Sequence, residues 1–465
     1  MISDDLQLGL DELKDSYEAY ETADAYARGQ SPEIFTSPAL RTALKRALRG
    51  YRHNFARLAI TTVEKRLALA GFSVPNDDAS TNLIEEIIST NELWQETRGI
   101  HNRVLTYGDY YVLAWPNQDG DPIVYPCGPD TTRIVYDIET QREAQFGIRS
   151  WTETQKAGSD HQIKINRASL YYENRIEKYF QPQQGQWQEF HVEGEEWPLV
   201  NEYDVMPLFH FRTARPYGEP EHLYAYGPQD AITKLILTHM SSVDYLGFPQ
   251  RYALIDPESA VGTSDLSGFS EDDADEDDQA VAGLRQGPGE LWALRAQSVG
   301  QFDAASAKDF LDSLNFYVRA MAQLTQTPVY NFDFSGEIPS GEARRIADAP
   351  QKAKASEHMR SLGATWQSVI AFCVLIKAGK EVDVVVDWLK DEVVGDKSWW
   401  ETAHLRHERN IPNSIILSEA GYTEDQIEEM GKVSETGVDK APEPIMGAVS
   451  EVKKVPKAPK PSDVK

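Results

Sequence analysis

The sequence has little cysteine, no long apolar run and no targeting signal. Cys127 and Cys373 are its only two cysteines and neither has a CxxC partner, which argues against a disulfide framework and against a zinc module. Cys373 lies in the apolar run "VIAFCVLI", where a buried thiol is expected. That run is far too short to cross a bilayer, and the acidic start "MISDDLQLGL" has no apolar signal-peptide core. We therefore predict a protein that folds in a cytoplasm and has no membrane partner.

Basic residues are also scarce. Lys and Arg number 46 against 74 for Asp and Glu, giving a formal net charge of −28 over 465 residues. A nucleic-acid binder carries a basic footprint, and a chain this acidic should repel polyanions rather than hold them. The densest basic stretch, residues 41–57, lies on a predicted helix. It indicates contact with nucleic acid or an acidic neighbour, or else an ordinary solvated face, which is the more common case.

The acidic extreme is "EDDADEDD" at 271–278, in which seven of eight residues are acidic. Such a run has no reason to collapse into a core and predicts a mobile loop. Calcium binding is the alternative, although the segment lacks the ligand order of an EF-hand.

Motifs of catalysis are missing. The sequence has no P-loop, no GxSxG and no GxGxxG between a strand and a helix. The ten histidines are scattered, and His404 and His407 have no Glu/His pattern around them. We predict no catalytic residue, no metal site, no cofactor and no enzyme activity. An enzyme with a diffuse active site stays open as an alternative.

The order of predicted elements indicates an α+β fold. Helical patterns cover 5–28, 37–69 and 82–107, and a β-rich block with hairpin spacing covers 105–215. Helices over 227–247 and 304–326 then flank a small module, 248–303, with strands "RYALID" and "GELWALRA". After a loop at 327–340, a long helix runs from Gly341 to about Lys377, followed by a strand "EVDVVVDW" and short helices. Pro350 should kink the long helix near 346–350.

The helix pair should not be stable alone. An apolar stripe on the second helix is formed by Phe310, Leu314, Tyr317, Met321 and Leu324. A projecting hairpin buries such stripes poorly, whereas copies packed side by side would bury them, so the pattern favours a ring. At the start of the long helix, Ser340 can cap the N-terminus and Gly341 permits close backbone approach.

In order and spacing, several segments resemble a known family. They are "VLTYGDYYVLAW", "PIVYPCGPDTTRIVYD", "VMPLFHFRTARPYGEPEHLYAYGPQDAITKLILTHM", "TPVYNFDFSGEIPSGEARR" and "HERNIPNSIILSEAGYTEDQIEEM". Over roughly residues 35–430 the chain is similar to the portal proteins, or head-tail connectors, of tailed double-stranded-DNA bacteriophages of the long-tailed type. The acidic loop at 270–279 departs from that pattern.

The resemblance implies a ring-forming portal fold with an α/β wing, a helical stem, a small strand-containing clip, a long kinked helix and a helical crown. Mapped onto the sequence, the parts are the N-terminal region and wing (1–226), first stem helix (227–247), clip with the acidic loop (248–303), second stem helix (304–326), tunnel loop (327–340), kinked helix and wing strand (341–388), crown (389–433) and a disordered Pro/Lys-rich tail (434–465).

The resemblance also implies a function and partners. Portal subunits form a ring, usually of about twelve copies, at one capsid vertex, through which double-stranded DNA is packaged, retained and ejected. The ring is assembled in the host cytoplasm and resides in the virion. Its partners are the terminase large subunit, a head-completion or adaptor protein, and the major capsid and scaffolding proteins. A scaffold or adaptor without a DNA channel is the remaining alternative.

Site residues follow from this mapping. In the tunnel loop we expect DNA-facing groups at Asn331, Phe332, Asp333, Phe334 and Glu337. We expect the helix start and a subunit contact at Ser340, Gly341, Arg344 and Arg345, and clip docking residues at Arg251, Tyr252, Trp292 and Arg295. Because cations are disfavoured at a helix N-terminus, at least one of the two helix-start arginines should pair with a carboxylate of its own subunit or of a neighbour. The alternative is that both are ordinary solvated charges.

Overall fold

The computed structural model describes residues 3–30, 53–157, 161–182, 185–192, 194, 196–247, 251–254, 298–301, 307–332, 340–389, 397–409 and 411–419. The chain divides into two compact units, Met1–Leu389 and Lys390–Lys465. The second unit contains two short helices, α9 (Lys397–Glu408) and α10 (Asn413–Glu419). Everything described below belongs to the first unit.

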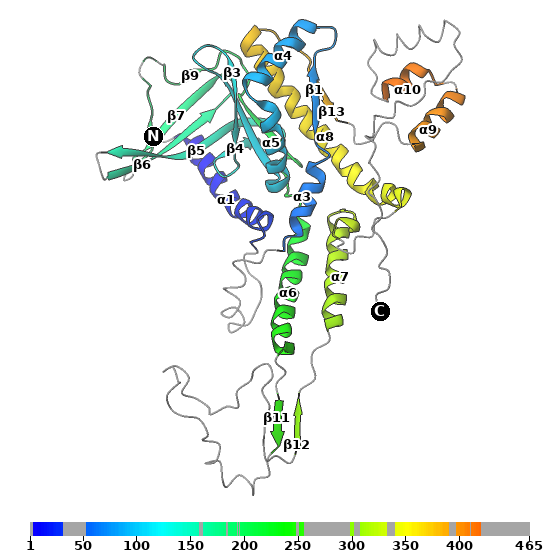
Figure 1. Cartoon of the computed structure of the whole chain (residues 1–465). Coiled ribbons are helices and arrows are strands. Elements are labelled where there is room, and N and C mark those ends of the chain that lie inside the picture. Colours follow the sequence, from blue (N-terminus) through cyan, green and yellow to red (C-terminus); the bar gives the residue numbers. More distant parts are fainter. Residues whose placement is uncertain are drawn as a thin grey trace, which may run out of the picture. The chain divides into compact units, whose positions relative to one another are not determined.

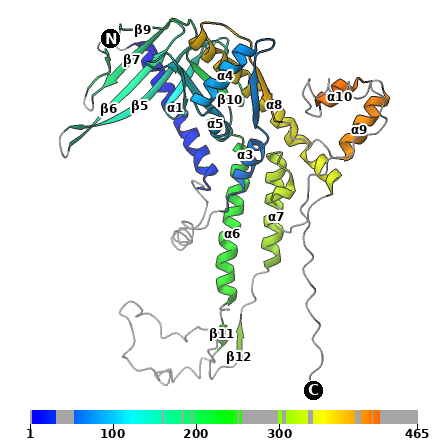
Figure 2. The ribbon, with the colours of Figure 1, turned by 45° about the horizontal axis from the view of Figure 1, so that its top comes forward.

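Helices cover the outer faces of two stacked antiparallel sheets (Figures 1 and 2). The smaller sheet has the order β10 (Leu208–Arg212), β2 (Asp109–Pro116), β3 (Pro122–Cys127). The larger sheet runs β4 (Thr132–Tyr136), β5 (Ala144–Ala157), β6 (His161–Tyr171), β7 (Arg175–Gln181), β8 (Gln188–Glu189), and β9 (Leu199–Val200) also pairs with β7. The covering helices are α1 (Asp4–Ala27) on the larger sheet, and α4 (Asp78–Thr90), α5 (Leu93–Tyr107) and α8 (Gly341–Ala378) on the smaller one.

Strand β2 is the centre of this arrangement because both of its faces are buried. Tyr110, Val112 and Ala114 pack with the helices, whereas Tyr111 and Leu113 pack with the larger sheet. Successive side chains of a strand point to opposite faces. A strand covered on both sides therefore needs an unbroken apolar run, which "YYVLA" supplies.

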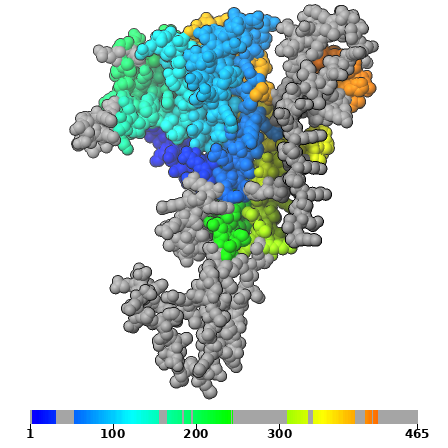
Figure 3. Space-filling model, viewed as in Figure 1, coloured from blue at the N-terminus to red at the C-terminus, as the bar shows by residue number. Residues whose placement is uncertain are grey.

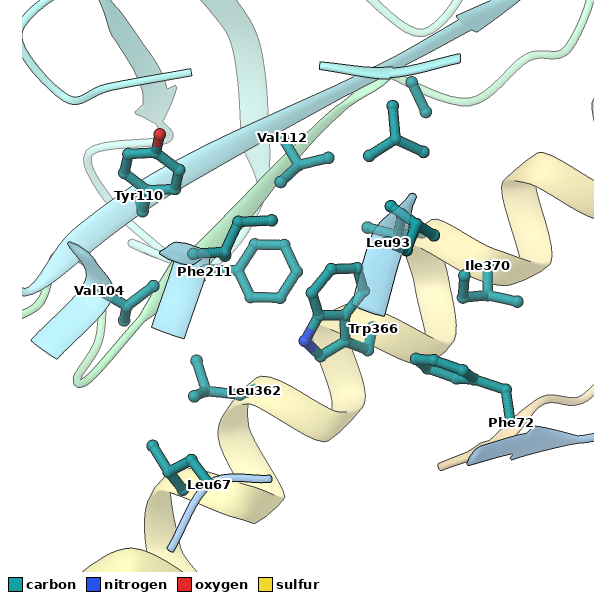
Figure 4. Packing of buried hydrophobic residues seen from close by; sticks show 14 of the residues in the cluster. Leu67, Phe72, Leu93, Val104, Tyr110, Val112, Phe211, Leu362, Trp366 and Ile370 are labelled. Carbon is teal, nitrogen blue, oxygen red and sulfur yellow. The ribbon is translucent and has the colours of Figure 1, made fainter. Parts of the chain in front are cut away.

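Trp366 of α8 is at the centre of the largest apolar cluster (Figure 4). Its side chain is fully buried and packs against Phe211, with ring centroids 4.8 Å apart, and against Phe72 at 6.1 Å. The indole Nε1–H donates to Nε2 of His101 at 2.9 Å, and the other ring nitrogen of His101 lies 2.9 Å from the carbonyl oxygen of Leu67. This core fixes α8 across the smaller sheet.

Helix α8 is the one described helix that is long and apolar enough to cross a membrane. Its apolar second half is buried against the protein core at Leu362, Trp366, Val369 and Ile370, as expected of a core helix. The helix continues through Pro350. The kink expected near 346–350 stays a prediction.

Helix α1 is held to the sheets by apolar and polar contacts. Leu6 and Leu13 are buried against the larger sheet. Tyr20 donates a hydrogen bond to the buried carboxylate of Asp109 at 2.8 Å, and Glu12 forms an ion pair with Arg133 at 2.9 Å. These bonds set which face of α1 is turned inward.

A second apolar cluster joins α6 (Tyr226–Gly247), α7 (Ala307–Leu324) and the start of α3 (Ala56–Glu64). The two long helices lie side by side in both ribbon views (Figures 1 and 2). Leu314, Tyr317 and Met321 of the predicted stripe pack into this cluster. Leu324 does not, since it is 53% exposed.

Two details of the sequence-based prediction were wrong, and a third is not tested. The helix predicted to reach Leu69 stops at Glu64, and Leu69–Ser73 forms β1, which pairs with β13 (Val385–Trp388). The helix predicted over 82–107 is two helices, α4 and α5. It is broken at Asn91, whose side chain bonds the backbone of Pro122 and Val124 in β3. Strand β11 (Arg251–Leu254) pairs with β12 (Ser298–Gln301), beyond the predicted strand 289–296, which lies outside the described residues.

Candidate functional site

The candidate site is the junction where α7 ends and α8 begins. Helix α7 closes with two hydrogen bonds, from the N–H of Thr327 to the carbonyl of Ala322 at 2.9 Å and from the N–H of Gln326 to that of Gln323 at 3.2 Å. This pair of bonds is the Schellman motif, which requires a left-handed residue at the position of Gln326. Gln326 has a φ of 55° there. Pro328 follows, which prevents the helix from continuing.

Phe332 is buried rather than presented to a ligand. Its side chain is 3% exposed and belongs to the cluster of α3, α6 and α7, with its ring centroid 5.8 Å from that of Phe55. The expectation that Phe332 faces DNA is therefore wrong for this structure, because an aromatic side chain in such a cluster gains more from burial than from water contact. Asn331 is half-buried beside it.

Asp348 connects three elements at this junction. Its carboxylate accepts a hydrogen bond from the hydroxyl of Tyr330 and forms an ion pair with Arg66 at 3.2 Å. The guanidinium of Arg344 lies over the Tyr330 ring, 5.2 Å from its centroid. Burial and the hydrogen bond to Asp348 raise the pKa of Tyr330. The first turns of α8 are thus fixed to the end of α7 and to the segment after α3.

A second buried ionic group lies two turns further along α8. Oε1 of Glu221 is 2.6 Å from Nζ of Lys354, and its Oε2 is 2.9 Å from Nε2 of His358. Lys354 also donates to the carbonyl of Thr325, at the end of α7, at 2.8 Å. Burial alone would raise the pKa of Glu221, but the hydrogen bond from His358 and the charge of Lys354 outweigh it and hold that pKa below its ordinary value.

The start of α8 has the predicted cap. Oγ of Ser340 accepts from the N–H of Ala343 at 3.4 Å. Arg345 forms an ion pair with Glu342 at 3.1 Å, as expected for at least one of the two arginines. The partners are 70% and 66% exposed, so the pair contributes little to stability. A Cβ on Gly341 would meet nothing within 4 Å among the described residues, so its role at a subunit contact stays a prediction.

The remaining predicted site residues are not tested. Asp333, Phe334, Glu337, Trp292 and Arg295 lie outside the described residues. Arg251 and Tyr252 lie in β11, where the backbone alone is described. Within the described part of the chain, no three His, Cys, Asp or Glu side chains come together as a metal site.

Sequence reasoning missed the ionic groups at Asp348 and Glu221. Glu221 and Lys354 are 133 positions apart, and the quoted segment that contains Glu221 does not indicate its partner. One signal was present but weak: Lys354 and His358 are four residues apart, so they share one face of a helix.

The family assignment agrees with this architecture. A family model described as "Phage portal protein, SPP1 Gp6-like" matches residues 8–440. Since the match covers most of the 465 residues, the chain is a phage portal protein. Within this class it belongs to the SPP1 Gp6-like family. The resemblance inferred from the sequence is thereby confirmed.

Among solved structures, the chain is similar to a chain of the "Virion of native gene transfer agent (GTA) particle", with 12% sequence identity, a TM-score of 0.43, and coverage of 88% of this chain and 99% of that one. It is also similar to a chain of the "Neck of native GTA particle computed with C12 symmetry", with 13% identity, a TM-score of 0.43, and coverage of 87% and 99%. No curated protein matches the chain.

Proposed function

We propose that copies of this chain form a closed ring at one capsid vertex, and that double-stranded DNA passes through its channel during packaging and ejection. Membership of the portal family supports this proposal. The observation that carries it is the set of exposed apolar side chains along α7. Leu311, Phe316 and Leu324 are 54%, 66% and 53% exposed in the single chain.

Two of these side chains lie on the flanks of the buried line of α7. At about 100° per residue, Leu311 and Leu324 lie about 70° to either side of the line through Leu314 and Met321. Phe316 lies about 150° from that line, on the outward face of the helix. A subunit that contacts a neighbour on each side needs two such flanks. A head-to-tail contact of this kind generates a ring when its rotation closes.

For the parts of the ring, we propose the assignment that the resemblance implies. Helices α6 and α7 form the stem, and the segment with β11 and β12 forms the clip, where the terminase large subunit and an adaptor protein dock. Residues 327–340 form the tunnel loop, above a base that the Asp348 and Glu221 groups hold to the stem. The net charge of −28 suits a channel wall, because phosphate contacts would otherwise retain the DNA. The ring acts as a passive conduit, and ATP hydrolysis belongs to the terminase.

The test is a charge placed on one flank of α7. Leu324→Asp should abolish ring formation while leaving helix content by circular dichroism unchanged, because the side chain is exposed in the single chain and buried in the ring. Arg319→Asp, on the outward face of the same helix and about 140° from Leu324, is the matched control and should assemble normally. Rings of Leu324→Asp at the wild-type concentration would exclude α7 as the subunit contact. A wild-type protein that never forms rings would favour a scaffold without a channel.

A further inference from the structure

A cleft of about 540 Å³ opens between the end of α1, α3 and α5. Four arginines line it, which is unusual in a chain with a formal net charge of −28. Arg28 pairs with Asp24 at 2.8 Å, and Arg98 pairs with Glu64 at 2.8 Å.

The other two arginines of the cleft have no such partner. Arg57 and Arg103 are exposed and make no ion pair with any described residue. Both oxygens of Glu64 are already engaged, one with Arg98 and the other with Asn102 at 2.6 Å. The cleft therefore carries two uncompensated positive charges over an apolar floor that includes the buried side chains of Ala27 and Ile60.

The outward face of α1 has the opposite character. Asp11, Asp15, Glu18 and Glu21 are exposed on it, with Lys14 between them. Among the described residues, the hydrogen bonds that these four carboxylates make are those from Gln7 to Asp11 at 3.0 Å. Tyr17 is 52% exposed beside them. Part of the dark-blue surface of α1 is visible in Figure 3. The helix thus presents an acidic stripe with one exposed aromatic ring.

We propose that the arginine cleft receives the acidic stripe of α1 from a second copy of this chain. The stripe supplies the carboxylates that Arg57 and Arg103 lack, and guanidinium–carboxylate pairs are among the stronger charge-assisted contacts. Tyr17 can lie against a guanidinium, as aromatic rings commonly do.

The overall charge favours a second copy over DNA as the occupant. Subunits of −28 repel one another, so assembly requires attraction between opposite charges where two copies meet. The same acidic chain repels phosphates as they approach it. Cleft and stripe occur once each in every copy, so the contact is head-to-tail, as a ring requires. The proposal rests on the ring proposed above and names which surfaces join its subunits.

The first test is charge reversal with rescue. Arg57→Glu/Arg103→Glu and, separately, Asp15→Arg/Glu18→Arg should each raise the protein concentration for half-maximal assembly by about tenfold or more at 0.1 M salt, and high salt should reduce the difference. The chain carrying all four changes should recover assembly. Arg142→Glu/Arg409→Glu changes the net charge by the same amount at two exposed arginines and should assemble like the wild type.

A cross-link keeps the test decisive if charge reversal disturbs folding. The native thiols are buried, and burial raises the pKa of Cys373 to about 12, so they should not react. Glu18→Cys/Arg103→Cys should form disulfide-linked multimers on oxidation, whereas either single change should not.

Three outcomes would overturn the proposal: normal assembly of both charge-reversed chains, no recovery in the chain with four changes, or no multimers from the double-cysteine chain. Rings that form normally from Arg57→Glu/Arg103→Glu but bind duplex DNA more weakly would assign the cleft to phosphates instead. A wild-type protein that forms no rings would overturn the proposal of a ring. The other results would leave that proposal intact.

Discussion

Replacing Glu221 by glutamine should destabilise the first unit by about 3 kcal/mol at pH 7. The carboxylate side chain is 6% exposed and contacts Lys354 and His358 at 2.6 and 2.9 Å. Glutamine keeps the shape but removes the charge, which leaves Lys354, 20% exposed, without its ionic partner. Removing one member of a buried pair typically costs about 3–5 kcal/mol. The lower end of this range applies because Lys354 keeps its hydrogen bond to the carbonyl oxygen of Thr325.

Urea unfolding followed by tryptophan fluorescence measures this cost at a fixed protein concentration. Lys354→Met in the Glu221→Gln background should recover about 2 kcal/mol, because it removes the unpaired charge. Glu219→Gln, at an exposed neighbouring carboxylate, is the control and should change the free energy of unfolding by less than about 0.5 kcal/mol.

The same variant has a pH signature. The pKa of Glu221 in the folded protein lies below its ordinary value of 4.5, so the carboxylate contributes stability above that pH and loses it as the pH falls through the folded pKa. The difference between wild type and Glu221→Gln should therefore shrink below about pH 4.5. An equal urea midpoint at pH 7, or a difference that persists unchanged into acid, would refute the role given to this group.

Three further predictions concern buried side chains of the first unit and the end of α7. Trp366→Phe should cost about 1–3 kcal/mol in urea unfolding, because it removes the N–H that bonds buried His101; a neutral result would contradict that bond. Gln326→Gly should raise the melting temperature, with a gain of up to about 1 kcal/mol, since Gln326 has a φ of 55°; a lower melting temperature would count against the helix end described. Burial lowers the pKa of both His101 and His222 to about 4, so the unfolded chain binds more protons than the folded chain between pH 4 and 6.5. The free energy of unfolding should therefore decrease as the pH is lowered through that window, by up to about 3 kcal/mol per histidine. Unfolding midpoints that stay constant from pH 6.5 to 5 would exclude this effect.

Much of the α+β pattern could be predicted because the signals are local. Helix α7 has its apolar stripe at helical spacing, and β2 has an apolar run bounded by turn formers. The helix start at Ser340 was predictable for the same reason, because an N-cap hydroxyl bonds within its own first turn.

Features set by distant partners could not be predicted. The break between α4 and α5 depends on bonds from Asn91 to β3, and β1 exists because β13 pairs with it. Phe332 lies in a polar, turn-rich segment, but three helices with buried apolar faces converge on it. The ionic groups at Glu221 and Asp348 likewise join residues more than a hundred positions apart.

The mass of the assembled protein in solution tests the central claim most directly. Mass photometry of the wild-type chain at low salt should give one dominant species that is a fixed multiple, about twelvefold, of the 52.3 kDa subunit, and negative-stain images of it should show a ring with an axial opening. A mass of one or two subunits across the accessible concentration range, or large particles with no fixed multiple and no opening, would contradict the account.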